Sequence, residues 1–199
     1  MTQTERPDPT APPAVTRRVA AAWMAGGLAW AVAGLVHGDD GWRFDTAAVI
    51  WIVADVLLLL GLVGLFALRP HGPSRVGATA LGLAVLARLA FTAGEVVSIL
   101  DGNDEGSLIP LGALLTAVAM TVYGIVVLRR SGPGSGRWSF LVMGVYPFVA
   151  MFPVLAITGE PSSLLIAGWG VPAMLVGAAA WAAAGGSDRL APGGPALVR

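Results

Sequence analysis

Six long runs of apolar residues, separated by short polar segments, make up most of the chain. They span residues 19–36, 46–68, 76–100, 108–128, 138–157 and 163–184. A helix needs about 20 apolar residues to cross a hydrocarbon core of about 30 Å, and every run meets or approaches that length. Polar and apolar positions do not alternate within the runs, as they do in the strands of a membrane β-barrel. The pattern therefore predicts an all-α, polytopic bundle of six transmembrane helices.

The polar segments between the runs fall into two classes by charge. Arginines mark every second segment, namely Arg17, Arg18, Arg69, Arg75, Arg129, Arg130, Arg137, Arg189 and Arg199. The alternate segments are acidic, with Asp39, Asp40, Asp45, Asp101, Asp104, Glu105 and Glu160 beside a single Arg43. Segments rich in arginine stay in the cytoplasm, so both termini are predicted to be cytoplasmic and the acidic segments to face outward.

The two ends of the chain differ from the bundle in composition. Residues 1–18 are polar and proline-rich, and residues 185–199 are rich in glycine and proline. We expect two flexible cytoplasmic tails flanking a transmembrane domain of residues 19–184. One alternative concerns the first run, because Arg17 and Arg18 before an apolar stretch also fit a cleavable export signal. Cleavage would leave five helices in the same orientation.

Composition excludes several classes of function. Charged residues are 12% of the chain, against about 25% in soluble domains, and hydrophobic residues are 56%. The absence of cysteine excludes thiol catalysis and cysteine-ligated metals. Twelve basic and twelve acidic residues balance, so no basic surface for nucleic acid is expected. His37 and His71 lie at opposite ends of one predicted helix, so they are not expected to share a metal, and we expect neither a metal nor a cofactor. The lysine-free, alanine- and glycine-rich usage is typical of a bacterial protein, so we expect the bacterial cytoplasmic membrane.

Three ionisable residues lie within the predicted spans: Asp55, Arg88 and Glu95. A charge at the bilayer centre costs roughly 2.5–3.5 kcal/mol, so each needs a partner or a function. At about 1.5 Å per residue, Asp55 is roughly 13 Å, Arg88 roughly 18 Å and Glu95 roughly 7 Å below the outer surface. Helices joined by a short connection pack antiparallel, so these residues are predicted to form a polar seam between the second and third spans.

Two interpretations of the seam remain open. In the first, Asp55 and Arg88 form an ion pair that only holds the two helices in register. In the second, the seam lines a site in which Glu95, with Asp55, gains and loses a proton, since a carboxyl group in apolar surroundings is able to act as an acid.

Further residues within the spans are candidates for lining such a site. The substrate-binding candidates are Arg88, Trp51, Phe91, Thr92, Tyr123, Tyr146 and Trp169, with Trp30 as a further aromatic wall. Core packing accounts for the aromatic residues equally well. Pro147, Pro153 and Pro172 interrupt the last two spans, which is typical both of ordinary kinks and of substrate sites in transporters.

Three hypotheses of function follow. The chain binds or transports an apolar or weakly charged small molecule; or it is an intramembrane enzyme, a cyclase or isomerase, that protonates a prenyl-type substrate with Glu95; or it is an accessory subunit whose small residues pack against a membrane partner or a second copy. We favour binding or transport, with the lipid bilayer as solvent.

Overall fold

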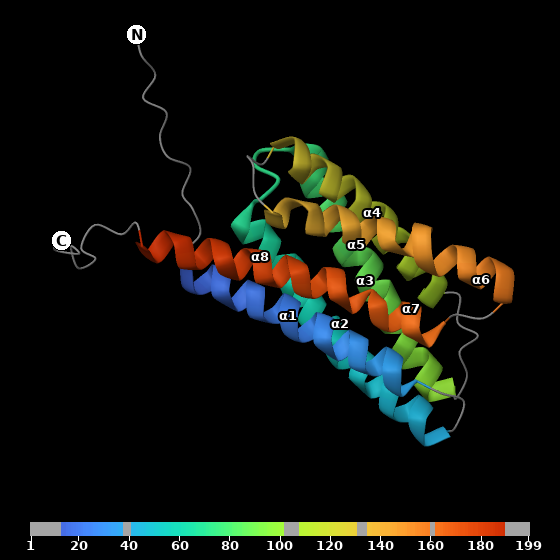
Figure 1. Ribbon diagram of the computed structural model, residues 1–199. Coiled ribbons are helices and arrows are strands. Elements are labelled where there is room, and N and C mark those ends of the chain that lie inside the picture. Colours follow the sequence, from blue (N-terminus) through green and yellow to red (C-terminus); the bar gives the residue numbers. More distant parts are fainter. Residues whose placement is uncertain (1–12, 38–40, 102–107, 131–134, 160–161, 190–199) are drawn as a thin grey trace, which may run out of the picture.

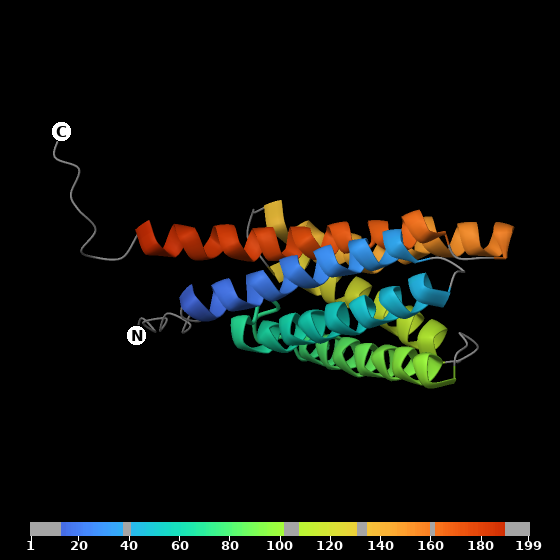
Figure 2. The same cartoon turned by 90° about the horizontal axis from the view of Figure 1, so that it is seen from below.

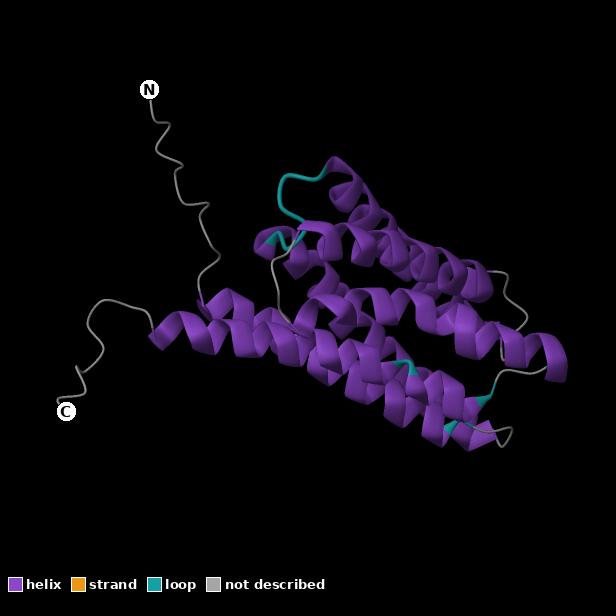
Figure 3. Cartoon of the chain, turned by 45° about the horizontal axis from the view of Figure 1, so that its top comes forward, coloured by secondary structure: helices purple, strands orange, loops and turns teal. Residues whose placement is uncertain are grey.

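The structure is a computed structural model that describes residues 13–37, 41–101, 108–130, 135–159 and 162–189. The described residues are helical apart from short turns, and none of them lies in a strand (Figure 3). The predicted tails at residues 1–12 and 190–199 lie outside the described ranges. Residues 13–18 and 185–189, which were expected in the tails, instead belong to the first and last helices.

The helices follow the predicted runs closely. They are α1 (Pro13–Val36), α2 (Gly41–Leu68), α3 (Arg75–Asp101), α4 (Leu108–Arg130), η1 (Ser135–Arg137), α5 (Trp138–Tyr146), η2 (Pro147–Met151), α6 (Phe152–Thr158), α7 (Ser163–Gly168) and α8 (Gly170–Arg189). The fifth span comprises α5, the π-helical segment η2 and α6, and the sixth comprises α7 and α8. Six stretches are long and apolar enough to cross a membrane, which confirms the prediction of a multi-pass helical bundle.

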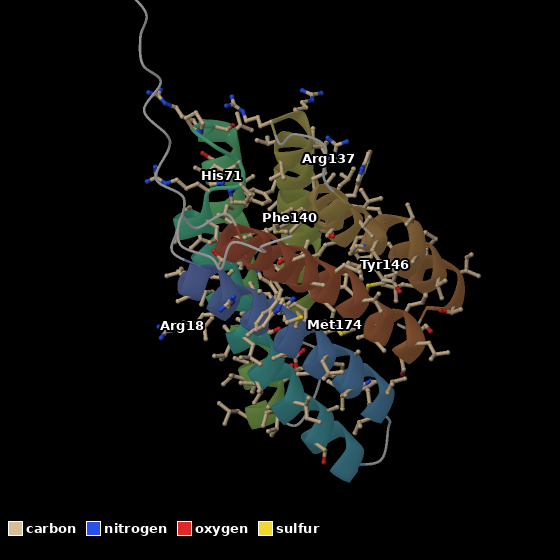
Figure 4. All side chains as sticks on the ribbon, turned by 60° about the vertical axis from the view of Figure 1, so that its left-hand side comes forward. Arg18, His71, Arg137, Phe140, Tyr146 and Met174 are labelled. Carbon is tan, nitrogen blue, oxygen red and sulfur yellow. The ribbon has the colours of Figure 1, made fainter. Side chains whose placement is uncertain are left out.

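The helices run back and forth along one axis. The start of α1 and the end of α8 lie at the same end of the bundle, whereas α1 leads into α2 at the opposite end (Figure 1). His71 and Arg137 also lie at the end where α1 begins (Figure 4). The helix ends that carry Arg17, Arg18, Arg69, Arg75, Arg129, Arg130 and Arg137 therefore lie at one end of the bundle.

Glycine allows α1 to pack closely against α8 and α7 (Figures 1 and 2). A Cβ atom at Gly27 would lie 2.6 Å from the carbonyl oxygen of Gly170, and one at Gly34 would lie 2.6 Å from the backbone nitrogen of Ala167. Small residues let membrane helices approach to backbone contact in this way. The close approach brings Trp30 of α1 next to the interruption in the sixth span.

Prolines cause the interruptions in the fifth and sixth spans. Pro147 and Pro172 have no backbone N–H, so the carbonyls of Met143 and Gly168, four residues earlier, lack their helical donor. An indole replaces one of the missing bonds: Trp169 Nε1 donates to the Met143 carbonyl at 3.1 Å. At the end of α7, Trp30 Nε1 donates to the Ile166 carbonyl at 2.8 Å and the Tyr146 hydroxyl to the Leu165 carbonyl at 2.9 Å, beside the backbone N–H of Trp169. The kinked region is therefore held together by aromatic donors.

Candidate functional site

An ion pair joins the second and third spans inside the bundle. The guanidinium of Arg88 on α3 donates to the carboxylate of Asp55 on α2. The hydroxyl of Thr92 lies 2.9 Å from the other carboxylate oxygen and 2.9 Å from the backbone carbonyl of Arg88. Asp55 is fully buried and Arg88 is 2% exposed. The predicted pairing across α2 and α3 is confirmed.

Three aromatic rings surround the guanidinium of Arg88. Its central carbon lies 4.3 Å from the ring centre of Trp30, 4.9 Å from that of Phe91 and 5.0 Å from that of Trp169. Trp30 also packs against the other two, with ring centres 5.5 and 5.0 Å away. The face of an aromatic ring attracts a cation within about 6 Å. The chain therefore fills its own aromatic cage with Arg88, which offsets part of the cost of burying that charge.

A cavity of about 640 Å³ adjoins this cluster. Residues from all six spans line it: Trp30, His37, Trp51, Arg88, Phe91, Glu95, Ile109, Pro110, Ala113, Leu114, Thr116, Ala117, Pro147, Met151, Phe152, Leu155, Ala156, Ser162, Leu165, Ile166 and Trp169. They belong to the half of the bundle where α1 leads into α2, next to the acidic connections. Small-molecule sites typically enclose about 300–1,000 Å³. The cavity is large enough for a ligand of that class.

Glu95 and Arg88 are the charged residues on the cavity wall. They lie seven residues apart on α3 and therefore on one face of that helix. Glu95 is 6% exposed, and its charge acts on Arg88. Asp55 lies behind Arg88 and does not line the cavity. The cluster thus holds two carboxyl groups and one guanidinium.

Four residues of the wall hold buried polar atoms that lack a hydrogen-bond partner in the described part of the chain. The atoms are Nδ1 of His37, Nε1 of Trp51, Nε of Arg88 and Oγ1 of Thr116. A buried polar group without a partner costs about 1–3 kcal/mol. The nitrogen atoms of Trp51 and Arg88 can only donate. These atoms are enclosed by neighbouring groups, so the unused donors lie behind the surface that a ligand in the cavity would touch.

The α6 end of the fifth span forms a thin side wall. Phe152, Leu155 and Ala156 of α6 line the cavity, whereas Ile157 on the same helix is 84% exposed. None of the residues of α6 is buried, and among the described elements it packs only against η2. A single loosely held helix therefore separates this side of the cavity from the surface that faces lipid.

The described residues include no group of three or more His, Asp or Glu side chains placed to hold a metal ion. No protein-family model, curated protein or solved structure matches the chain. The functional conclusion therefore rests on the cavity and its charged cluster.

The structure brings most of the predicted site residues together. Those that line the cavity are Trp51, Arg88, Phe91, Glu95 and Trp169. Asp55 and Thr92 lie behind them and position Arg88. Since Asp55 is enclosed by its partners, it is a positioning residue for Arg88 in this geometry, and Glu95 is the carboxyl group that faces the cavity.

Tyr123 and Tyr146, also predicted for the site, do not line the cavity. The hydroxyl of Tyr146 is used by Leu165 in the sixth span. Tyr123 lies near the opposite end of the bundle, where its hydroxyl is 3.4 Å from Nδ1 of His71 and its ring packs edge-on against Phe140. The phenol groups of Tyr123 and Tyr146 thus contribute to helix packing and do not belong to the candidate site.

His71 belongs to the turn between α2 and α3. Its side chain is buried against Tyr123, and Ser74 caps the start of α3 by accepting a hydrogen bond from the Gly77 backbone N–H at 3.2 Å. Burial, followed by the charges of Arg69 and Arg130, lowers the pKa of His71 below its ordinary value. Neutral imidazole is therefore the form that this packing favours.

Several residues that line the cavity were not identified as site residues from the sequence. His37 and Thr116 line the cavity, as do apolar residues of the fifth span such as Met151 and Phe152. Depth alone would have indicated the first two: Thr116 is eight residues, roughly 12 Å, from the outer end of its span, a depth close to that of Asp55. The apolar wall residues resemble any other residue of a membrane helix.

Proposed function

We propose that the chain binds an apolar or weakly charged small molecule in the cavity beside Arg88. The observation that carries this proposal is an apolar, aromatic cavity of about 640 Å³ with a charged cluster on one wall. Apolar walls with a few convergent polar groups are typical of small-molecule sites. The binding site belongs to a multi-pass protein of the bacterial cytoplasmic membrane, with both termini in the cytoplasm and the cavity in the outer half.

The ligand enters from the membrane. The thin wall formed by α6 supports this route, because its packing is confined to η2 and its other face is exposed. A molecule dissolved in lipid reaches such a side entrance without crossing water. Displacement of a single helix also requires fewer broken contacts than separation of α1 from α8.

Glu95 couples binding to protonation. Glu95 is buried on a largely apolar wall, where an ionised carboxylate is costly. A proton on Glu95, or a weakly basic group of the ligand beside it, neutralises that carboxylate. This coupling is the basis for proposing transport as well as binding.

Binding is tested with an apolar fluorescent dye, N-phenyl-1-naphthylamine, and the purified chain in detergent micelles. Ala113 lines the cavity, whereas Ala93 on α3 is exposed on the outer surface. Ala113→Phe fills part of the cavity and is expected to weaken dye binding by about tenfold, or about 1.4 kcal/mol. Ala93→Phe adds the same side chain outside and should leave binding unchanged. Equal affinities for the two variants would remove the proposed site.

Transport is tested in vesicles with and without a proton gradient, using the same dye as cargo. We expect uptake or efflux that depends on the gradient, and Glu95→Gln should abolish that dependence while leaving dye binding intact. Transport that is unaffected by Glu95→Gln and by Asp55→Asn would contradict the protonation mechanism.

A second candidate function, protonation of a prenyl-type substrate, is favoured by one observation: the carboxyl residue Glu95 lies on the wall of an aromatic-lined cavity. Such an enzyme needs one acid in surroundings poor in water. Product analysis after incubation with prenyl substrates distinguishes the two functions, because a binding protein returns the substrate unchanged. Full turnover by Glu95→Gln would exclude Glu95 as the acid.

A further inference from the structure

A second, smaller cavity lies at the turn between α2 and α3. Its volume is about 320 Å³, and its wall includes Phe66, Arg69, His71, Ser74 and Arg75. None of its residues lines the larger cavity beside Arg88. We infer that this turn cavity binds the phosphate group of an anionic phospholipid. The inference is independent of the proposed small-molecule site, because the two cavities share no wall residue.

Two arginines supply the positive charge of the turn cavity. Arg69 directly follows the last residue of α2, and Arg75 is the first residue of α3. Both side chains are exposed and both line the cavity, so a ligand is able to reach them. Neither pairs with a carboxylate in the described part of the chain. A guanidinium keeps its charge at physiological pH and binds phosphate through two parallel hydrogen bonds.

The backbone of Arg69 adopts a conformation that normally requires glycine. Among the described residues it is the only one other than glycine with a positive φ, at 47°. Helices commonly end with glycine at such a position, since a Cβ atom is disfavoured there. Arg69 nevertheless closes α2, with its N–H donating to the Leu65 carbonyl at 2.9 Å. An unfavourable residue at a strained position indicates that its side chain has a function.

The position of the turn cavity favours a lipid over a dissolved anion. One apolar span ends at Leu68 and the next begins at Arg75, so the turn lies just outside the spans. Phe66 belongs to the span, lines the same cavity and is 39% exposed. The cavity therefore has cations at the depth of the lipid headgroups and an aromatic ring beside the acyl chains.

The charge of the wall favours an anionic lipid over a zwitterionic one. Residues 66–78 contain no Asp or Glu, so the ammonium group of a choline or ethanolamine headgroup finds no carboxylate there. A further arginine, Arg130 at the end of α4, acts on His71 together with Arg69. The surroundings of the cavity thus attract a phosphate that carries an uncompensated negative charge and repel a headgroup cation.

The test measures lipid binding to the full chain by native mass spectrometry. The chain in detergent micelles is titrated with phosphatidylglycerol or with phosphatidylcholine of the same acyl chains. We expect phosphatidylglycerol to bind at least about tenfold more tightly, as two arginines at a membrane surface predict. Arg75→Gln and Arg69→Gly should each weaken phosphatidylglycerol binding about fivefold and leave phosphatidylcholine binding unchanged.

Arg18 provides a matched control for charge. It is exposed on α1 at the same end of the bundle, and it lies apart from His71 and does not line the turn cavity (Figure 4). Arg18→Gln removes the same charge and should weaken phosphatidylglycerol binding by less than about twofold. Equal losses for Arg18→Gln and Arg75→Gln would show diffuse attraction to a basic end of the bundle and would overturn the inference.

Arg69→Gly separates a loss of binding from a loss of structure. Glycine accepts the positive φ without strain, so this variant should unfold at a higher temperature than the wild type in phosphatidylcholine micelles. A more stable chain that binds phosphatidylglycerol more weakly supports the inference. Unchanged phosphatidylglycerol binding by both Arg69→Gly and Arg75→Gln would overturn it. Displacement of the lipid by millimolar inorganic phosphate would also overturn it, because the site would then take a dissolved anion.

Discussion

Arg88 and Asp55, on neighbouring spans, form an ion pair that three aromatic rings and Thr92 enclose. Because both side chains are buried, removal of one partner leaves the other charge without compensation. Removal of both leaves only a change in packing. The difference between these two cases determines the first prediction.

Asp55→Leu alone should destabilise the chain by about 3–5 kcal/mol, because Arg88 keeps its buried charge. The double variant Asp55→Leu with Arg88→Met should recover most of that loss. Thermal unfolding in micelles measures both effects, with Ser98→Ala as a buried polar control. A double variant no more stable than the single one would show that the pair does more than balance charge.

Trp169 and Pro147 are coupled through the carbonyl of Met143. Trp169→Phe removes the indole donor and should cost about 1 kcal/mol. In a Pro147→Ala background the Met143 carbonyl regains its helical donor, so the same substitution should cost clearly less. A double-mutant cycle of unfolding free energies measures the coupling. Additive effects would argue against the shared carbonyl.

The interruptions also show which parts of the fold the sequence predicts. The six spans follow from run length, and the ion pair follows from depth, since a rise of about 1.5 Å per residue is enough to match Asp55 with Arg88. The aromatic donors were not predictable. Trp30 reaches the Ile166 carbonyl through the close packing of α1 against α7, and Trp169 reaches the Met143 carbonyl through the packing of the sixth span against the fifth.

No pattern in the sequence predicts the cavity itself. Its walls come from all six spans, so it depends on how the helices pack together, which the length and composition of each run do not specify. Tyr123 was assigned to the site because it is aromatic and within a span. It is fifteen residues, roughly 22 Å, from the end of α4 at Leu108, whereas Glu95 is six residues, roughly 9 Å, from the end of α3 at Asp101. Depth would have separated these two residues.

His71 makes stability depend on pH. Its pKa is lowered in the folded chain, so the unfolded chain binds more protons in the acidic range. Stability contributed by His71 is therefore fully present above the unfolded pKa of about 6.5 and is lost as the pH falls through the folded pKa. Unfolding temperatures in micelles should decline below about pH 6.5, and His71→Gln should reduce that decline. His37→Gln is the matched control, and an equal decline in all three proteins would contradict this role.

The orientation is testable because the chain has no cysteine. Single cysteines at Ser107 and Ser131 lie in an acidic and a basic connection, respectively. With intact cells, a membrane-impermeant maleimide should label Ser107→Cys and should label Ser131→Cys only after lysis. The reverse pattern would place the cavity in the cytoplasmic half of the membrane.

Photolabelling locates the binding site most directly. An apolar probe with a diazirine group is added to the chain in native-like membranes, illuminated, and its adducts are mapped by mass spectrometry. We predict adducts on the cavity wall, at Met151 and Leu114, that disappear when excess unlabelled ligand is present. Adducts confined to outward-facing residues such as Leu86 and Leu164, and unaffected by excess ligand, would show that the probe meets only the lipid-facing surface and that the cavity is not a binding site.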